Sequence, residues 1–404
     1  MTNPLERAAA AAKQFLHNVA DGVSHGLAGP PSEDAPGIPS TMYPLAANMS
    51  GNSPGNGPAL APGTVKNLGP IAGTGAQPGI SSIGAADLGE IVTLPNGRLV
   101  SVFGDSFKGN RVGGPDSDHY RSVAVPIAGW ENDGRAIYGT PFNGTGGPGS
   151  PNILFPPPNN ALMLDPNTNT LPAGSILVGD TTYMMVAGTA ALHVTAGSWL
   201  VQVTDDPADG WHSTLGSWRA GDAPNTPSQI SGYLAADGMV YIVGDAFNRS
   251  QGVTLYRVDP ATVTDRNSWQ PWTGTSWGAP GNVPQVVSGQ QTFGELSMRQ
   301  VGSSTVLSGF NSTTHVWQVE VRVAADPTQL FAAGTPVVVA AQQHTPTDPN
   351  FVFQPYGGYI VPGSTLTNMN LLVSQWNTGN DANGVPLGAP YDTQQMVLNV
   401  ASSN

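Results

Sequence analysis

The sequence of 404 residues contains no cysteine, few charged residues and no run of basic residues. The absence of cysteine excludes disulfides, thiolate catalysis and cysteine-based metal sites. Charged residues make up 10% of the chain, against roughly 25% in an average soluble domain. The formal net charge is −13, and nucleic-acid binding needs basic side chains that neutralise phosphates. We therefore expect no nucleic-acid partner. No apolar run approaches the roughly 20 residues that cross a bilayer as a helix.

Glycine and proline are abundant instead, at 51 and 37 residues, which is too many helix breakers for a helical protein. Hydrophobic residues still make up 39% of the chain, so a core can form. Because charged residues are scarce, the surface must consist of Ser, Thr, Asn, Gln and backbone groups. Such surfaces are common on proteins that work outside cells and on proteins that bind sugars.

Residues 1–25 predict the one convincing amphipathic helix of the chain. Asn3 can cap this helix, Pro4 suits its first turn, and an apolar stripe follows one face. The stripe must pack on its own domain, on a partner chain or, less favourably, on a membrane, for which the polar face has too few basic residues. Arg7 and Lys13 interrupt the apolar run that a signal peptide needs, so we expect no signal peptide.

Residues 26–79 are dense in Pro, Gly, Ser and Ala and have almost no aromatic side chains. This composition predicts an extended arm or linker without a core of its own. We expect residues 1–77 to bury little surface against the rest of the same chain. They should order through other chains, in a symmetric oligomer or on a larger assembly.

Residues 80–404 alternate short apolar runs with Gly, Asn, Asp and Pro turns, and they lack helical periodicity. This pattern predicts an all-β domain. Weak internal repeats favour a propeller: Val102–Phe107 reads VFGDSF and Val243–Phe247 reads VGDAF, each after a hairpin turn. Five hairpin units of roughly 65 residues each predict a five-bladed β-propeller, with a last strand near Met396–Val400 that helps to close the ring.

The hairpins that define these units are expected at fixed places. Four turn at Pro95-Asn96-Gly97, Gly179-Asp180, Asp237-Gly238 and Gly302-Ser303, and the fifth unit holds Gly358–Pro362 and Leu371–Trp376.

Two aspartates of the first hairpin are the strongest candidates for catalysis. If the turn at residues 95–97 is a three-residue loop, Asp87 and Asp105 lie opposite each other on one side of the sheet. Like charges in this position are unfavourable, and one carboxyl pKa should rise. A glycosidase needs such an acid/base or acid/nucleophile pair. A two-residue loop would instead separate the two side chains, and Asp105 would then cap a turn while Asp87 is solvated.

Other polar and aromatic residues lie near strand ends, where they could hold a sugar by hydrogen bonds and ring contacts. Taken singly, each such residue is more often a turn or core residue. The candidates for substrate binding are Glu295, Asn160, Gln229, Gln354, Tyr356 and Trp376. Asp245 repeats the position of Asp105 in a later unit and is interpreted as a structural turn residue.

Metal binding is not expected. The seven histidines show no metal-ligand spacing, and the acidic segments 116–118 and 165–169 lack the glycine and distal glutamate of an EF-hand. No G-x-S-x-G sequence and no phosphate-binding loop occurs. The sequence therefore predicts no metal and no cofactor.

Four short motifs then carry a family resemblance: VFGDSF at 102–107, FGELS at 293–297, YGGYIVP at 356–362 and LLVSQW at 371–376. Their order and spacing resemble a propeller family of actinobacteria and their phages, long classed as a domain of unknown function. That family is associated with endo-D-arabinanases, which cut the D-arabinan of mycobacterial arabinogalactan and lipoarabinomannan. The resemblance covers residues 80–396. It implies a five-bladed propeller and two catalytic aspartates about eighteen residues apart, a spacing that falls on Asp87 and Asp105.

The resemblance makes an endo-acting glycoside hydrolase of D-arabinan the leading expectation. Residues 1–77 are not part of the family domain, so we expect a minor tail protein of a mycobacterial phage that docks on other tail proteins. Its location would be the virion, or outside the cell if it is secreted. The alternatives are a receptor-binding propeller that holds arabinan without cutting it and a purely structural tail component.

Overall fold

The computed structural model describes residues 54, 59–113, 118–143, 153–158, 169–190, 193–221 and 225–401. These residues form β-strands and short 3-10 turns, and no α-helix occurs among them, so the all-β prediction is confirmed. None of the described helical turns could cross a membrane. The predicted helix at residues 1–25 lies outside the described residues. The 3-10 turns are η3 (Pro207–Asp209), η4 (Pro260–Thr262) and η5 (Pro327–Gln329).

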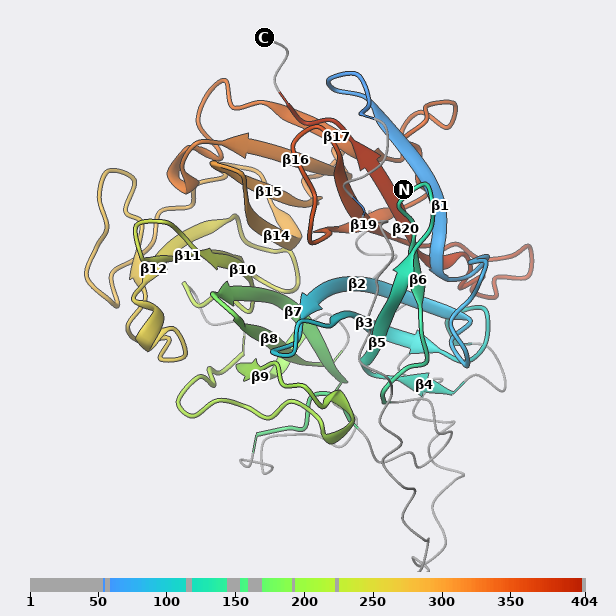
Figure 1. Ribbon diagram of the computed structural model, residues 1–404, viewed down its shortest axis with the longest axis horizontal. Coiled ribbons are helices and arrows are strands. Elements are labelled where there is room, and N and C mark those ends of the chain that lie inside the picture. The colour runs from blue at the N-terminus through green and yellow to red at the C-terminus, as the bar shows by residue number, and fades with distance from the viewer. Residues whose placement is uncertain are drawn as a thin grey trace, which may run out of the picture.

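The strands form four sheets that surround a common centre (Figure 1). The first has the order β2 (Ala85–Thr93), β3 (Leu99–Phe107), β5 (Val123–Trp130), β6 (Ala136–Tyr138), with β4 (His119–Tyr120) beside β3. The second has the order β13 (Gln270–Pro271), β12 (Thr254–Val258), β11 (Val240–Asp245), β10 (Gln229–Leu234), β7 (Asn169–Val178), β8 (Thr181–Ala190), β9 (His193–Gln202). The third consists of β14 (Phe293–Val301), β15 (Ser304–Asn311), β16 (Gln318–Ala324), β17 (Val337–Gln342). The fourth has the order β1 (Val65–Gly73), β20 (Tyr391–Leu398), β19 (Met369–Trp376), β18 (Pro355–Ile360).

The seven-stranded sheet divides naturally between β7 and β10. These two strands pair in parallel, through Ile176 with Gly232 and Leu177 with Tyr233, whereas the other strand pairs within the sheets are antiparallel. Divided there, the described strands make five antiparallel units whose first strands are β2, β7, β10, β14 and β18. Each predicted hairpin joins the first two strands of one unit.

The first strands are closely packed, and small residues make this packing possible. Gly174 of β7 has a φ of 90°, and a Cβ atom there would lie 1.7 Å from the carbonyl oxygen of Ile230 in β10. Four of the five first strands, β2, β7, β14 and β18, also contain a bulge. A bulge bends a strand and changes the direction of its side chains.

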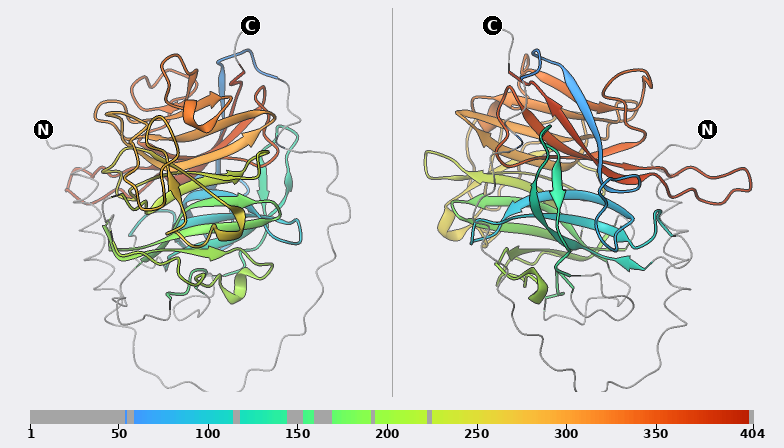
Figure 2. Two further views of the ribbon diagram at one scale, coloured as in Figure 1. Left: turned by 90° about the vertical axis from the view of Figure 1, so that its left-hand side faces the viewer. Right: turned by 45° about the vertical axis from the view of Figure 1, so that its right-hand side comes forward.

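The predicted extent of the N-terminal arm is wrong at strand β1. Residues 65–73 were expected to belong to a segment with little contact to its own domain, but they pair along β20, and Ile71 and Ala72 are buried. The sequence obscured this strand because Gly69 and Pro70 interrupt its apolar pattern, and the ladder is indeed irregular around Pro70. The last sheet therefore joins a strand near the start of the described chain to strands near its end (Figure 2).

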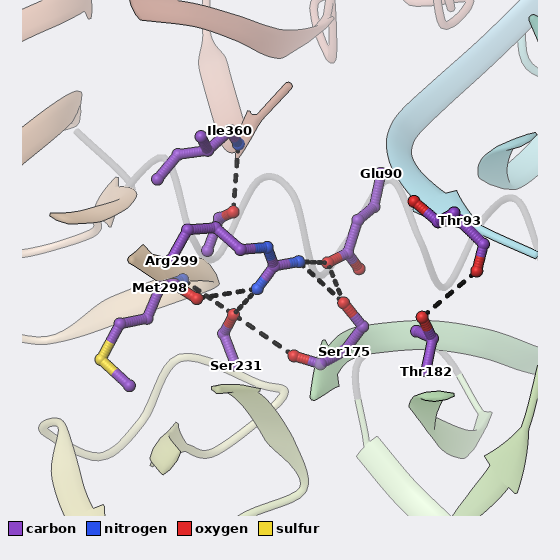
Figure 3. Close-up of polar contacts among 9 residues, drawn as sticks. Glu90, Thr93, Ser175, Thr182, Ser231, Met298, Arg299 and Ile360 are labelled. Atoms are coloured by element: carbon purple, nitrogen blue, oxygen red, sulfur yellow. Dashed lines mark hydrogen bonds and ion pairs between the residues drawn. The ribbon is translucent and has the colours of Figure 1, made fainter. Parts of the chain in front are cut away.

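A buried ion pair connects the first strands at the centre (Figure 3). Arg299 of β14 lies 2.7 Å from the carboxylate of Glu90 in β2. The guanidinium group also donates to the hydroxyls of Ser175 in β7 and Ser231 in β10, both at 2.8 Å. Two residues before Arg299 in β14, Ser297 Oγ accepts a hydrogen bond of 3.0 Å from the backbone N–H of Ile360 in β18. Polar contacts thus link all five units.

Removal of the arginine should destabilise the fold strongly. In the variant Arg299→Met the Glu90 carboxyl keeps its burial, at 1% exposure, but loses its counter-charge. Breaking a buried pair in this way costs about 3–5 kcal/mol, which urea unfolding would measure.

Two controls accompany this measurement. The double variant Glu90→Gln with Arg299→Met removes both charges and should recover part of the loss. Arg135→Met breaks a partly exposed ion pair with Glu131 and Asp133 and should cost at most about 1 kcal/mol. Equal losses for Arg299→Met and Arg135→Met would contradict a central role for the buried pair.

Candidate active site

The first hairpin brings Asp87 and Asp105 together at the predicted place. Its turn has the predicted three-residue form, since the N–H of Leu94 bonds to the carbonyl of Arg98. The predicted register holds at the Ala86–Ser106 and Glu90–Val102 pairs. Between these pairs a bulge at Leu88, which has a φ of 64°, interrupts the ladder. The two aspartates are therefore neighbours, but they do not form a regular cross-strand pair.

Asp87 is buried, with 9% of its surface exposed. The Tyr356 hydroxyl donates to Asp87 Oδ2 at 3.0 Å, and the Tyr391 hydroxyl lies close to the same carboxyl. Among the described residues Oδ1 has no hydrogen-bond partner. This oxygen lies against Gly104, where a Cβ atom would come within 2.7 Å of it. Burial, followed by the charge of Asp105, raises the pKa of Asp87 well above its ordinary value, although the tyrosine hydroxyls oppose the rise. The environment thus favours a protonated Asp87.

Asp105 has a different environment. Its side chain is 25% exposed, and its Oδ1 accepts a hydrogen bond from Asn169 Nδ2 at 2.5 Å. The same oxygen lies 2.6 Å from His119 Nε2. Burial lowers the pKa of Arg121, and the negative charge of Asp105 opposes that shift. Two nitrogen atoms thus contact one oxygen of Asp105, and Arg121 lies close enough to interact with the charge of this carboxylate.

A second group of charged residues lies next to this pair. Glu295, near the start of β14, forms an ion pair with Arg249, and its N–H donates to Gln229 Oε1 at 2.8 Å. The Arg249 guanidinium lies over the ring of Tyr356, 5.6 Å from its centroid. Tyr356 therefore contacts both groups, with its hydroxyl on Asp87 and its ring face against Arg249.

Asp245 belongs to this second group, and the sequence-based interpretation of it as a turn residue is wrong. It is the last residue of β11, opposite Gln229 of β10. Only 2% of its surface is exposed, and neither carboxylate oxygen has a hydrogen-bond partner among the described residues. Burial, with a contribution from Glu295, raises the pKa of Asp245 well above its ordinary value. The repeat of the Asp105 position thus coincides with a second buried carboxyl beside Glu295.

The remaining candidate residues differ in their placement. Trp376 packs edge-on against Tyr391, with ring centroids 5.8 Å apart, so it lies beside the site. Gln354 uses its side chain to bond the N–H of Thr378 at 2.8 Å and holds a loop. Asn160 lies outside the described residues.

Sequence reasoning did not select Tyr391, Arg249, His119 or Asn169. Each reaches the site from another strand or loop, and no local motif marks any of them. Within the described part of the chain, no group of three or more histidine and acidic side chains could hold a metal ion.

Comparison with known proteins assigns the chain to a family. The model of the domain of unknown function DUF4185 matches residues 75–397. The chain belongs to the DUF4185 family. An uncharacterized 35.9 kDa protein of Mycolicibacterium smegmatis is similar to this DUF4185 chain, with 37% identity over 351 residues, 82% of this chain and 97% of the relative.

A solved structure shares the fold of this DUF4185 chain at low identity. A "putative hydrolase" from Bacteroides ovatus has a TM-score of 0.53 at 12% identity, over 78% of this chain and 86% of that one. Arabinanase Arb43A of Bacillus subtilis has a TM-score of 0.41 at 12% identity, over 78% and 95% of the two chains. The α-L-arabinofuranosidase PaAbf62A of Podospora anserina has a TM-score of 0.45 at 10% identity, over 83% and 97%. The likeness to the Bacteroides ovatus protein, at 12% identity, concerns the fold alone.

The pH dependence of stability can be tested at Asp392, the neighbour of Tyr391 in β20. Its side chain is buried at 2% exposure, and burial raises its pKa from 3.8 to about 7. Because the pKa of Asp392 is raised in the folded state, its contribution to the stability of the fold is complete below about pH 4. This contribution is lost as the pH rises through 7. Asp392→Asn should therefore become more stable relative to the parent between pH 5 and pH 8, by up to a few kcal/mol.

Chemical denaturation of both proteins at the two pH values measures this effect. Asp265→Asn makes the same charge change at an exposed turn residue and should show no such trend. A parallel pH trend in the two variants would contradict the role of burial at Asp392.

Proposed function

We propose that this chain is an endo-acting glycoside hydrolase that cleaves D-arabinan of the mycobacterial cell envelope. In this proposal the five antiparallel units are the blades of a five-bladed β-propeller. Asp87 and Asp105 lie where the first blade begins, and they carry the chemistry.

The observation that carries the proposal is the contrast between these two neighbouring carboxyls. Asp87 is buried beside two tyrosine hydroxyls and has a raised pKa, whereas Asp105 is more exposed and accepts a hydrogen bond from Asn169. A carboxyl whose pKa is raised by burial can hold the proton that a general acid donates, and a second carboxyl beside it can serve as its partner. We assign Asp87 as the general acid and Asp105 as the general base or nucleophile.

The reaction then follows from these assignments. Asp87 transfers its proton to the glycosidic oxygen as the bond from that oxygen to the anomeric carbon breaks. The ionised Asp105 either takes a proton from the attacking water or itself attacks the anomeric carbon, after which water releases the sugar. Tyr356 and Tyr391 can stabilise the Asp87 carboxylate that remains, because the Tyr356 hydroxyl donates to it and the Tyr391 hydroxyl lies close to it.

Contacts to the sugar are assigned to the remaining site residues. Glu295, Tyr356 and Trp376 lie around the pair, where carboxylate and aromatic groups can bind furanose hydroxyls and ring faces. Gln229 and Gln354 have side chains engaged with Glu295 and Thr378, so we assign them to the support of the site.

The substrate rests on the resemblance of the four motifs to the endo-D-arabinanase family. The mycobacterial origin of the 37% identical relative supports it, since D-arabinan is part of the mycobacterial envelope.

A place on a phage tail is a further part of the proposal, and it rests on the composition of the N-terminal segment. Because β1 is part of the domain, the segment that docks on other tail proteins would end before Val65. Light scattering of the full chain and of a chain that begins at residue 59 tests whether this segment mediates assembly. Equal oligomeric states would argue against docking between copies.

The test of catalysis is incubation with purified mycobacterial arabinogalactan and analysis of the products. The parent should release arabino-oligosaccharides, and Asp87→Asn and Asp105→Asn should each reduce the rate at least about a hundredfold, because each removes an acid–base function. Both variants should still bind the polysaccharide. Asp237→Asn, at an exposed hairpin turn, should remain fully active.

Near-full activity of both site variants would show that these aspartates are not catalytic. Binding of arabinan by the parent without any cleavage would favour a receptor-binding propeller instead. The low exposure of Asp87, 9%, fits the alternative of a receptor-binding propeller that does not cleave arabinan.

The pH profile offers a separate test of the acid. The hydrogen bond from Tyr356 lowers the pKa of Asp87. Its removal in Tyr356→Phe should raise that pKa further, keep the acid protonated to higher pH and move the alkaline limb of the activity profile upward. A downward shift would argue that Asp87 acts in its ionised form.

A further inference from the structure

Two side chains from different units converge on one oxygen atom of Asp105. Asn169 Nδ2 lies 2.5 Å and His119 Nε2 lies 2.6 Å from Asp105 Oδ1. Among the described residues, Asp105 Oδ2 accepts no hydrogen bond. The two oxygens of this carboxylate are therefore inequivalent.

The fold fixes the position of His119. It belongs to the two-residue strand β4, where it pairs with Phe107 of β3. Its ring also stacks on the Phe107 ring, with centroids 5.0 Å apart and an interplanar angle of 26°. Phe107 in turn packs edge-on against Tyr391, with ring centroids 6.0 Å apart, and the Tyr391 hydroxyl lies close to Asp87. The imidazole is thus held by packing as well as by its hydrogen bond.

The fold also fixes the position of Asn169. It is the first residue of β7, paired with Thr189 of β8, so it reaches Asp105 from the second unit. One donor thus comes from the unit that carries Asp105 and the other from its neighbour. A rotation of the carboxylate would break both hydrogen bonds.

The chemistry of these groups sets the direction of both bonds. An ionised carboxylate can only accept hydrogen bonds. Asn169 therefore donates through its amide N–H, and His119 must carry a proton on Nε2. Two donors on Oδ1 fix the plane of the carboxylate. The free lone pairs are then on Oδ2.

We propose that His119 and Asn169 are positioning residues that hold Asp105 Oδ1, so that Oδ2 is the oxygen that takes the proton or attacks the sugar. This inference rests on the proposed function of Asp105 as base or nucleophile. It assigns roles to two residues that do not themselves touch the substrate.

The test compares two replacements of His119 in the full-length chain. Glutamine can donate a single hydrogen bond from a similar distance, whereas leucine fills much of the space without a donor. On arabinogalactan, His119→Leu should lower kcat by about 10–100-fold, the range expected for loss of a hydrogen bond to a charged group, with little change in KM. His119→Gln should recover most of this loss. Asn169→Leu should behave like His119→Leu.

Thermal unfolding of each variant separates lost positioning from lost folding. If His119→Leu does not fold, the kcat of His119→Gln is compared with that of the parent. A kcat within about threefold of the parent value supports positioning by a hydrogen-bond donor. If the parent cleaves arabinan and His119→Leu cleaves it equally fast, the positioning role is wrong while the proposed function stands.

A nuclear magnetic resonance measurement is independent of activity. The parent should show a proton on His119 Nε2 that exchanges slowly with water, and Asp105→Ala should abolish this signal. If the parent never cleaves arabinan, the proposed function is wrong, and this signal alone then decides whether His119 holds Asp105. Its absence from the parent overturns the inference in every case.

Discussion

The ion pair between Glu90 and Arg299 lies where the first strands of all five units meet, and the surrounding structure accommodates it. Serines on two neighbouring strands supply hydroxyls to the guanidinium. Gly174 allows the backbones of β7 and β10 to approach each other. Burial raises the pKa of Glu90, and Arg299 opposes that rise. Burial of either charge without the other would be strongly destabilising.

The same strands position the candidate active site. Asp87 and Glu90 both lie in β2, and Glu295 and Arg299 both lie in β14. Each strand thus contributes one charged residue to the central pair and one to the site, with a bulge between them. The bulges put Leu88 and Glu295 at positive φ, a conformation that non-glycine residues adopt at an energetic cost. The cost is consistent with side chains whose direction is set by function.

Local patterns in the sequence predicted much of this arrangement. The turn at residues 95–97 and the alternation of the flanking strands sufficed for the register that brings Asp87 to Asp105. The other hairpins followed from similar turn signals. Strand β1 was missed because Gly69 and Pro70 occupy an irregular part of its ladder, so the segment resembled the arm before it. Its partner, β20, lies more than three hundred residues away in the sequence.

The candidate site could be predicted from the sequence only in part, because some of its residues come from distant parts of the chain. Asp87 and Asp105 belong to one hairpin, so local register sufficed. Asp245 was misinterpreted because an aspartate at a strand end usually makes a turn, and only its burial distinguishes it. His119 and Asn169 reach Asp105 through pairings that no local pattern specifies. Partners that are supplied by other units require the three-dimensional structure.

The pairing of β1 with β20 also affects when the candidate site can form during synthesis. Strand β1 is among the first described segments to leave the ribosome, and its partner is the last described strand. Tyr391, whose hydroxyl lies close to the Asp87 carboxyl, is the first residue of that strand. A nascent chain that contains both aspartates therefore still lacks part of the environment of Asp87. Only a chain translated past β20 can assemble this environment, because shorter fragments lack Tyr391 and the strand that pairs with β1.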